Sequence, residues 1–183
     1  QRVFSLGFTE PYFLDTLWST GFEVFSSLFP VPRRYTTRKL GFSARVGYPI
    51  ADDLYFYLTY KNEGMQIGQK YDSHVDASLD AGVLSSLVWS LIRDKRNNRL
   101  ETTNGNYQSA SLETAGMGGD KKFFKLMLNN RFYKPVVGDL VFRMSAEYGH
   151  ILPFGSAGIP NAERFFLGGQ MNMRGFNLYT VGP

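Results

Sequence analysis

Apolar and polar residues alternate with a period of two along most of this chain. Between Leu40 and Tyr48 the even positions hold Leu, Phe, Ala, Val and Tyr, whereas the odd positions hold Gly, Ser, Arg and Gly. This period is typical of a β-strand with one apolar and one polar face, and no segment shows a helical period. The pattern predicts eight antiparallel strands in simple up-and-down order, near residues 2–9, 16–28, 36–48, 53–62, 83–93, 106–116, 121–134 and 139–150.

The residues on the two faces favour a membrane barrel over a soluble β-sandwich. The apolar face places aromatic residues near strand ends, as at Trp18, Tyr48 and Tyr60, with aliphatic residues between them. This arrangement fits two membrane interfaces about 25 Å apart. Segments of about nine to twelve residues can cross a bilayer at a tilt, whereas sandwich strands are usually shorter. The predicted fold is all-β: a transmembrane antiparallel up-and-down β-barrel, present here as a partial wall of about eight strands plus a long inward-folding loop.

The composition agrees with this fold and excludes other classes. Aromatic residues make up 16% of the 183 residues, yet the mean hydropathy is −0.23, as expected of a barrel with a polar lumen. No run approaches the roughly 18 apolar residues of a membrane helix. The net charge of +4 comes from scattered basic residues that do not interleave with aromatic ones, which argues against nucleic-acid binding.

The sequence offers little for catalysis or for binding a metal ion. It has no cysteine, and His74 and His150 lie far apart, in or beside predicted outer loops without a nearby Ser/Asp arrangement. Asp72, Asp76 and Asp80 lack the spacing of an EF-hand. We therefore expect no enzymatic activity, no cofactor and no metal site.

The predicted connections differ in length on the two sides of the sheet. Residues 49–53 and 134–139 form compact turns on one side, whereas residues 29–37, 62–82 and 150–183 form longer loops on the other. Short periplasmic turns and long external loops are the convention of bacterial barrels, and only the 94–105 connection is long on the short-turn side. Since the chain starts without methionine and stops within a predicted loop, we expect an excerpt: residues 1–183 as a partial outer-membrane barrel domain, with strands to about 150 and residues 151–183 as a long loop folding into the lumen.

One cation in the last twenty residues is the strongest candidate for a functional side chain. Arg174 lies between apolar residues in a glycine-rich segment, and an arginine in such surroundings needs an acidic or aromatic partner elsewhere in the fold. Glu113 and Glu147 are candidate partners on the polar face. We expect residues 164–183 to fold towards the lumen, with a loop-anchoring motif formed by Gly168, Gly169, Arg174, Gly175 and Phe176.

Several motifs resemble the BamA-like family of outer-membrane assembly factors. Glu10-Pro11-Tyr12-Phe13 resembles a turn of that family, and Asp94 to Gly105 resembles its charged turn ending in Asp/Asn-Gly. Residues 166–169, 174–176 and 181–183 match its inward-folding external loop, although Met173 stands where the family usually has Val. The resemblance covers essentially the whole chain and implies an inner stretch of a larger barrel.

The resemblance implies a function that needs no cofactor. A BamA-like factor helps other β-barrel proteins fold and insert into the cell outer membrane of a Gram-negative bacterium. Its partners would be outer-membrane lipid, nascent outer-membrane barrel proteins and accessory lipoproteins of an assembly complex. Two alternatives stay open at this point: a two-partner-type secretion pore or translocation/assembly relative of the same superfamily, and a general porin.

The long loop bears on whether eight strands can close. A closed eight-strand barrel has an interior just wide enough for side chains, which leaves no space for a loop of about thirty residues. We therefore expect an open, curved wall whose first and last strands do not pair with each other.

Overall fold

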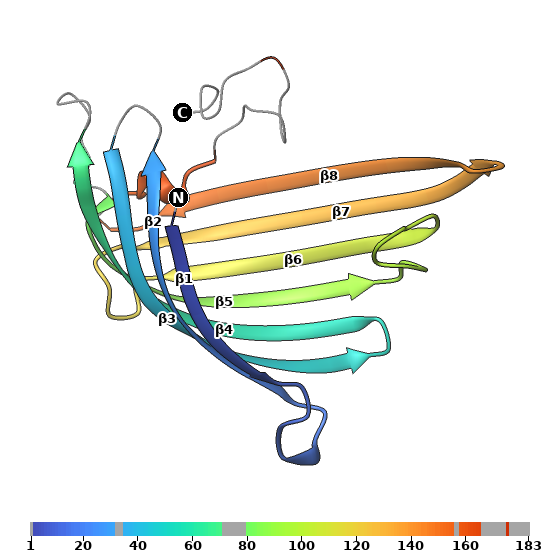
Figure 1. Cartoon of the computed structure of the whole chain (residues 1–183), viewed down its shortest axis with the longest axis horizontal. Helices are drawn as coiled ribbons and strands as arrows, with labels where there is room; N and C mark the ends of the chain where they lie inside the picture. The colour runs from blue at the N-terminus through green and yellow to red at the C-terminus, as the bar shows by residue number, and fades with distance from the viewer. Residues whose placement is uncertain (1, 32–34, 71–79, 156–157, 166–174, 176–183) are drawn as a thin grey trace.

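The chain folds into one antiparallel sheet whose eight strands follow each other in chain order (Figure 1). The computed structural model describes residues 2–31, 35–70, 80–155, 158–165 and 175. The strands are β1 (Arg2–Glu10), β2 (Ser19–Val31), β3 (Tyr35–Ala51), β4 (Leu54–Lys70), β5 (Gly82–Asp94), β6 (Gly105–Ala115), β7 (Phe123–Val137) and β8 (Leu140–Pro153). Short 3-10 helices within the described residues include η1 (Phe13–Asp15) and η3 (Asn161–Glu163). The predicted number, order and antiparallel sense of the strands are confirmed.

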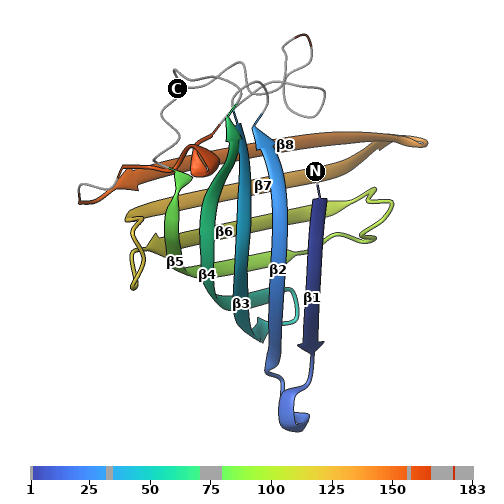
Figure 2. The ribbon, with the colours of Figure 1, turned by 60° about the vertical axis from the view of Figure 1, so that its left-hand side comes forward.

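The sheet is an open, curved wall, as Figures 1 and 2 show from two directions. β1 pairs with β2 and β8 pairs with β7, and within the described residues the two edge strands do not pair with each other. Each edge therefore presents a row of backbone groups that can pair with a further strand. The expectation of an open wall is confirmed. Within the described ranges, no helix is long and apolar enough to cross a membrane.

One face of the sheet, called the outer face, exposes large apolar side chains. Aromatic residues contact each other across neighbouring strands on this face: the ring centroids of Trp18 and Tyr48 are 4.8 Å apart, and those of Phe42 and Tyr60 are 6.0 Å apart. Phe42 remains 39% exposed despite these neighbours. So large an apolar surface is unfavourable in water and is the expected lipid-facing surface of a membrane barrel.

The opposite face, called the inner face, carries small, polar and charged residues over most of its area. Its buried apolar residues gather beside the segment that follows β8. Met65, Leu84, Ala115 and Phe123 form this small core, and Ile151 packs against it. Within the described residues, the apolar part of the inner face that is shielded from solvent lies near the strand ends that adjoin the long loops.

β4 is longer than the sequence predicted, because it extends to Lys70 instead of ending near residue 62. The additional residues pair with the start of β3, as in the pair Gly41 and Glu63. The alternation reverses here: Met65 points to the inner face and is 2% exposed, whereas Gln66, next along the strand, is exposed. A strand that projects beyond the apolar band meets water on its outer face, so the amphipathic pattern no longer marks it.

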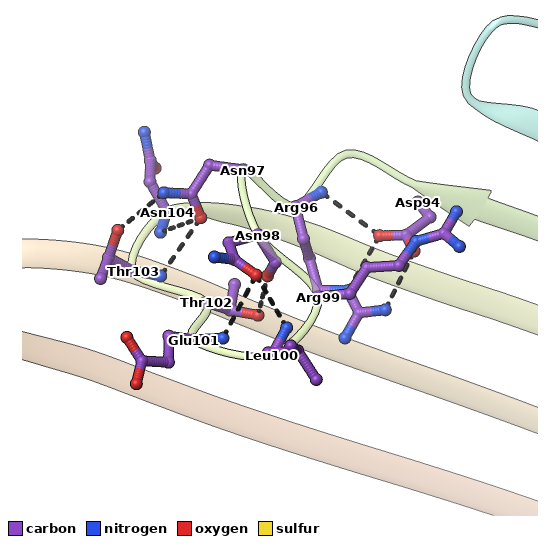
Figure 3. Close-up of polar contacts among 10 residues, drawn as sticks. All are labelled: Asp94, Arg96, Asn97, Asn98, Arg99, Leu100, Glu101, Thr102, Thr103 and Asn104. Atoms are coloured by element: carbon purple, nitrogen blue, oxygen red, sulfur yellow. Dashed lines mark hydrogen bonds and ion pairs between the residues drawn. The ribbon is translucent and has the colours of Figure 1, made fainter.

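The connection between β5 and β6 is held by hydrogen bonds from its own side chains (Figure 3). The Asp94 carboxylate accepts two hydrogen bonds from the Arg96 guanidinium, at 2.8 and 2.9 Å, and pairs with Arg99 at 3.3 Å. Asn97 Oδ1 accepts hydrogen bonds from the backbone N–H groups of Thr103, at 3.2 Å, and Asn104, at 3.1 Å. These bonds give the long turn one defined conformation without an apolar core.

The end of this turn depends on Gly105. Its φ is +110°, and a Cβ atom there would overlap the Lys95 carbonyl oxygen. We expect Gly105→Ala to destabilise the barrel by about 1–3 kcal/mol, because the alanine meets both backbone strain and the carbonyl. The measurement is the temperature at which the full-length protein loses its folded mobility on a gel. Gly64→Ala is the control, since a Cβ at Gly64 meets only the Leu40 carbonyl oxygen at 3.7 Å, and equal midpoints for the two variants would contradict the prediction.

Candidate functional site

Five charged residues meet on the inner face and are called the Glu163 cluster. Lys39 comes from β3, Lys61 and Glu63 from β4, Lys125 from β7, and Glu163 from η3 after β8. The Glu163 carboxylate lies 2.8 Å from Lys125 Nζ and 3.7 Å from Lys39 Nζ. Glu63 lies 3.0 Å from Lys39 Nζ and 3.3 Å from Lys61 Nζ. The cluster therefore links three strands of the wall to the segment that follows the last one.

Glu163 is the member of the cluster that the loop contributes. Pro160 precedes η3, and the Glu163 N–H donates to the Pro160 carbonyl oxygen at 3.0 Å, so a single tight turn presents the side chain to the wall. The side chain is only 9% exposed. Burial alone would raise the pKa of the Glu163 carboxyl, but Lys125, Lys61 and Lys39 together hold that pKa below its ordinary value. Glu163 is thus a buried carboxylate that stays ionised because lysines surround it.

A second set of contacts fixes the same segment to the end of the wall where β3 and β5 begin. Tyr35, at the start of β3, is 1% exposed, and its hydroxyl group donates a hydrogen bond to the Asp80 carboxylate. Asp80 also accepts a hydrogen bond from the Ala162 N–H at 3.3 Å, and Asn161 Nδ2 donates to the Tyr35 hydroxyl at 3.4 Å. Asp80 precedes β5, so these bonds join the β4–β5 connection, β3 and η3 at one point.

Phe165 packs against the inner face immediately after the cluster. Its ring lies over Gly149 of β8, where an added Cβ atom would be 2.6 Å from Cζ. Lys125 Nζ lies 5.4 Å from the centre of the same ring. Gly149 therefore allows the loop to approach β8 closely, and Lys125 contacts both Glu163 and Phe165. Figure 2 shows η3 beside the sheet.

Most of the predicted loop-anchoring motif cannot be compared with the structure. Gly168, Gly169, Arg174 and Phe176 lie outside the described residues. Gly175 is exposed and has a φ of +91°, a conformation that suits glycine. The anchoring role of this motif stays a prediction.

The two suggested partners of Arg174 make other contacts. The Glu113 carboxylate accepts a hydrogen bond from the Ser86 hydroxyl at 2.7 Å. The Glu147 carboxylate accepts one from Asn129 Nδ2 at 2.7 Å. Both lie on the inner face, as the alternation predicts. The pairing of either with Arg174 remains untested.

The sequence reasoning missed Glu163, although a signal was present. An acidic residue comes directly before an Arg-Phe-Phe-Leu-Gly-Gly run, and the strand that holds Lys125 contains no acidic residue. Isolated lysines on a face that turns inward need acidic partners. A comparison of the lysines on the inner face with the acidic residues of the loop would have indicated the contact between Lys125 and Glu163.

The described residues provide no arrangement suited to metal binding. No group of three or more His, Asp or Glu side chains is placed to hold a metal ion in the described part of the chain. His150 stacks on Tyr148 with ring centroids 6.5 Å apart, on the outer face. What the Glu163 cluster can do is structural: it can hold a loop segment against three strands by charge.

Comparison with known proteins gives a family match along the whole chain. The model described as the Omp85 superfamily domain matches residues 1–183. The Sorting and assembly machinery component 50 homolog of Bos taurus is 36% identical over 100 residues, which is 54% of this chain and 21% of that protein. The outer membrane protein assembly factor BamA of Neorickettsia risticii is 26% identical over 189 residues, which is 98% of this chain and 25% of that protein.

A solved structure has the same fold. The crystal structure of BamA from Haemophilus ducreyi lacking POTRA domains 1–3 superimposes with a TM-score of 0.86 over 99% of this chain and 38% of that chain, at 18% sequence identity. The chain thus spans about a fifth to a quarter of the length of the curated relatives given above.

Removing the charge of Glu163 should destabilise the barrel. Glu163→Gln keeps the shape of the side chain but leaves Lys125 without its carboxylate, and breaking a buried pair costs about 3–5 kcal/mol. We expect a lower midpoint of heat-modifiability for the full-length variant. Glu23→Gln is the matched control, because Glu23 is an exposed acidic residue on the inner face of β2. Equal midpoints for the two variants would show that the Glu163 cluster does not stabilise the wall.

A double-mutant cycle separates the ion pair from the side chains that make it. Lys125→Met removes the charge on β7, and Lys125→Met with Glu163→Gln removes both charges. We expect the double variant to lose clearly less stability than the sum of the two single variants, since neither charge is then left unpaired. Additivity of the losses to within about 0.5 kcal/mol would argue against direct coupling.

The cluster should also make stability depend on pH. A carboxyl with a lowered folded-state pKa stabilises the fold above its unfolded pKa, near 4.5, and loses that contribution as the pH falls through the folded value. The stability difference between the wild type and Glu163→Gln should therefore be constant near neutral pH and shrink below about pH 4.5. Heat-modifiability measured at a series of pH values checks this, and a difference that grows on acidification would refute it.

Proposed function

Because the chain belongs to the Omp85 superfamily, we propose that it is the barrel wall of a factor that folds and inserts other β-barrel proteins into an outer membrane. The observation that carries the proposal is the family match along residues 1–183. The names of the relatives support it, since both the sorting and assembly machinery component and BamA are described as assembly proteins. The protein of which this wall is a part would be larger, in keeping with the fraction of the relatives that it covers.

The barrel architecture supports a physical account of this function, in which the edge that receives a strand is the seam of the complete barrel, outside the stretch from β1 to β8. Unpaired strand edges are templates for additional strands, which can add by backbone hydrogen bonding. An incoming barrel strand can satisfy its backbone groups on such an edge before it enters lipid, where an unpaired group costs several kcal/mol. The reaction needs no covalent step, so the proposal includes no catalytic residue, cofactor or metal.

The loop contacts suggest how the wall keeps its shape while an edge is in use. The Glu163 cluster joins β3, β4 and β7 through ion pairs that do not depend on the edge strands. We propose that Arg174, with Gly168, Gly169, Gly175 and Phe176, adds a second anchor further along the same loop. The role of these five residues rests on their sequence pattern and on their resemblance to the BamA-like loop.

For the location and partners, we propose the cell outer membrane of a Gram-negative bacterium. The BamA proteins of Neorickettsia risticii and Neisseria meningitidis align along 98% of this chain, whereas the Bos taurus relative aligns along 54%. Outer-membrane lipid would contact the outer face, nascent barrel proteins would contact an edge, and accessory lipoproteins would complete the assembly complex.

Depletion of the full-length protein in its native host tests the function. We expect the folded, heat-modifiable forms of several unrelated outer-membrane barrels to decline together, because all of them would need the same assembly step. A decline in the export of one soluble protein, with barrel levels unchanged, would contradict the proposal and support a secretion pore.

Complementation of the depleted strain tests the role of the loop. Arg174→Ala and Glu163→Gln should each restore barrel assembly less well than the wild type, because each removes one anchor. Arg33→Ala, in a predicted outer loop, and Glu23→Gln, on β2, are the controls and should restore it fully. Full restoration by Arg174→Ala and Glu163→Gln would show that assembly does not need the anchored loop.

A further inference from the structure

The outer face, although mostly apolar, contains a groove that is lined partly by polar side chains. The groove has a volume of about 460 Å³ and lies across β5, β6, β7 and β8. Its floor is formed by the small side chains of Ala110 and Ala146, between larger neighbours such as Leu91 and Tyr148. Leu91 is 42% exposed and Tyr148 is 56% exposed, so the groove opens on the face that we assign to lipid.

One row of the groove is polar. Arg93 pairs with Gln108, and Gln108 pairs with Asn130, in successive register positions across β5, β6 and β7. Directly opposed residues share a face and lie about 5 Å apart, so three side chains with N–H donors follow each other along one edge of the groove. Among the described residues, the side chains of Gln108 and Asn130 make no hydrogen bond. Amide groups without partners on a lipid-facing surface are unfavourable unless a ligand binds them.

The charge at this edge is positive. Asp53, in the β3–β4 turn, lies 3.0 Å from Arg93 Nε and 3.2 Å from Lys95 Nζ. The hydrogen bonds from Arg93 and then Lys95 hold the pKa of the Asp53 carboxyl below its ordinary value, so it is ionised at neutral pH. Two cations thus share one carboxylate, which leaves one positive charge beside the polar row.

The position of the groove identifies the source of a complementary anion. Arg93 is the last residue but one of β5, next to the turns that lie on the side opposite the Glu163 cluster. A lipid-facing arginine near a strand end reaches the interface, where lipid phosphates lie. Arginine with neighbouring amide donors is well suited to a phosphate group, and a shallow apolar groove is suited to an acyl chain.

We propose that this groove binds one phospholipid from the leaflet on the short-turn side. Arg93, Gln108 and Asn130 bind the phosphate, and one acyl chain lies over Ala110 and Ala146. This lipid site depends on the proposed function only in requiring that the outer face lie in a bilayer. A bound lipid would satisfy the polar row and fill the depression left by the two alanines.

Native mass spectrometry of the full-length protein in detergent tests the site. The probes are phosphatidylglycerol and diacylglycerol with the same acyl chains, which differ by the phosphate headgroup. We expect one phosphatidylglycerol molecule to be retained, and Arg93→Gln to weaken this retention about tenfold, as expected for the loss of a charge-assisted hydrogen bond. Ala110→Phe should abolish retention because the new ring fills the groove.

Ala44→Phe is the matched control, because Ala44 is an exposed alanine on the outer face of β3, away from the groove. It should retain phosphatidylglycerol like the wild type, and heat-modifiability confirms that each variant is folded. Equal retention of diacylglycerol and phosphatidylglycerol, or unchanged retention in Arg93→Gln and Ala110→Phe, would overturn the site. Normal barrel assembly after depletion would refute the proposed function and leave the lipid site standing, so the two failures are distinguishable.

Discussion

The contact between Glu163 and Lys125 determines where the chain goes after the last strand. β8 ends at an exposed edge, and the segment after it could extend away from the sheet without breaking any strand pairing. Instead η3 lies on the inner face, with the Glu163 carboxylate 2.8 Å from Lys125 Nζ. An ionised carboxylate is costly to remove from water unless cations and hydrogen bonds compensate it. The lysines of three strands supply that compensation, and the small core of Met65, Leu84, Ala115 and Phe123 lies beside them.

The charge balance of the cluster explains why it acts as a unit. Three lysines surround two carboxylates, and Lys39 contacts both Glu63 and Glu163. Loss of Glu163 would leave Lys39 and Lys61 with Glu63, whereas Lys125 would retain only the ring of Phe165. The link between β7 and the loop is therefore more sensitive than the link between β3 and β4. If the seam of the complete barrel opens during assembly, such a link would keep β7 and β8 attached to the loop.

Much of this fold could be predicted from the sequence, because its strands carry their own pattern. The lipid-facing and lumen-facing residues alternate locally, so β3 and β8 are recognisable without knowledge of their partners. The end of β4 was not recognisable, since residues 63–70 leave the apolar band and become a strand by pairing with β3. The open edges followed from a volume argument about the loop.

The site was harder to predict, because its contacts join residues far apart in the chain. Lys39 and Lys125 carry no local sign that one carboxylate lies between them. Arg174 drew attention by its neighbours, whereas Glu163 lies between Ala162 and Arg164 in the sequence and resembles an ordinary loop residue. Only the three-dimensional structure shows that the Glu163 carboxylate lies beside Lys39 and Lys125.

Amide hydrogen exchange of residues 158–165 in the full-length protein is the most direct test of the claim that Glu163 holds this segment on the wall. The Glu163 and Arg164 N–H groups donate to the carbonyl oxygens of Pro160 and Asn161, at 3.0 and 3.3 Å. If the cluster secures the segment, these amides exchange slowly in the wild type and much faster in Glu163→Gln, while those in the middle of β7 stay protected in both. Fast exchange of residues 158–165 in the wild type, or equal protection in both proteins, would contradict the account.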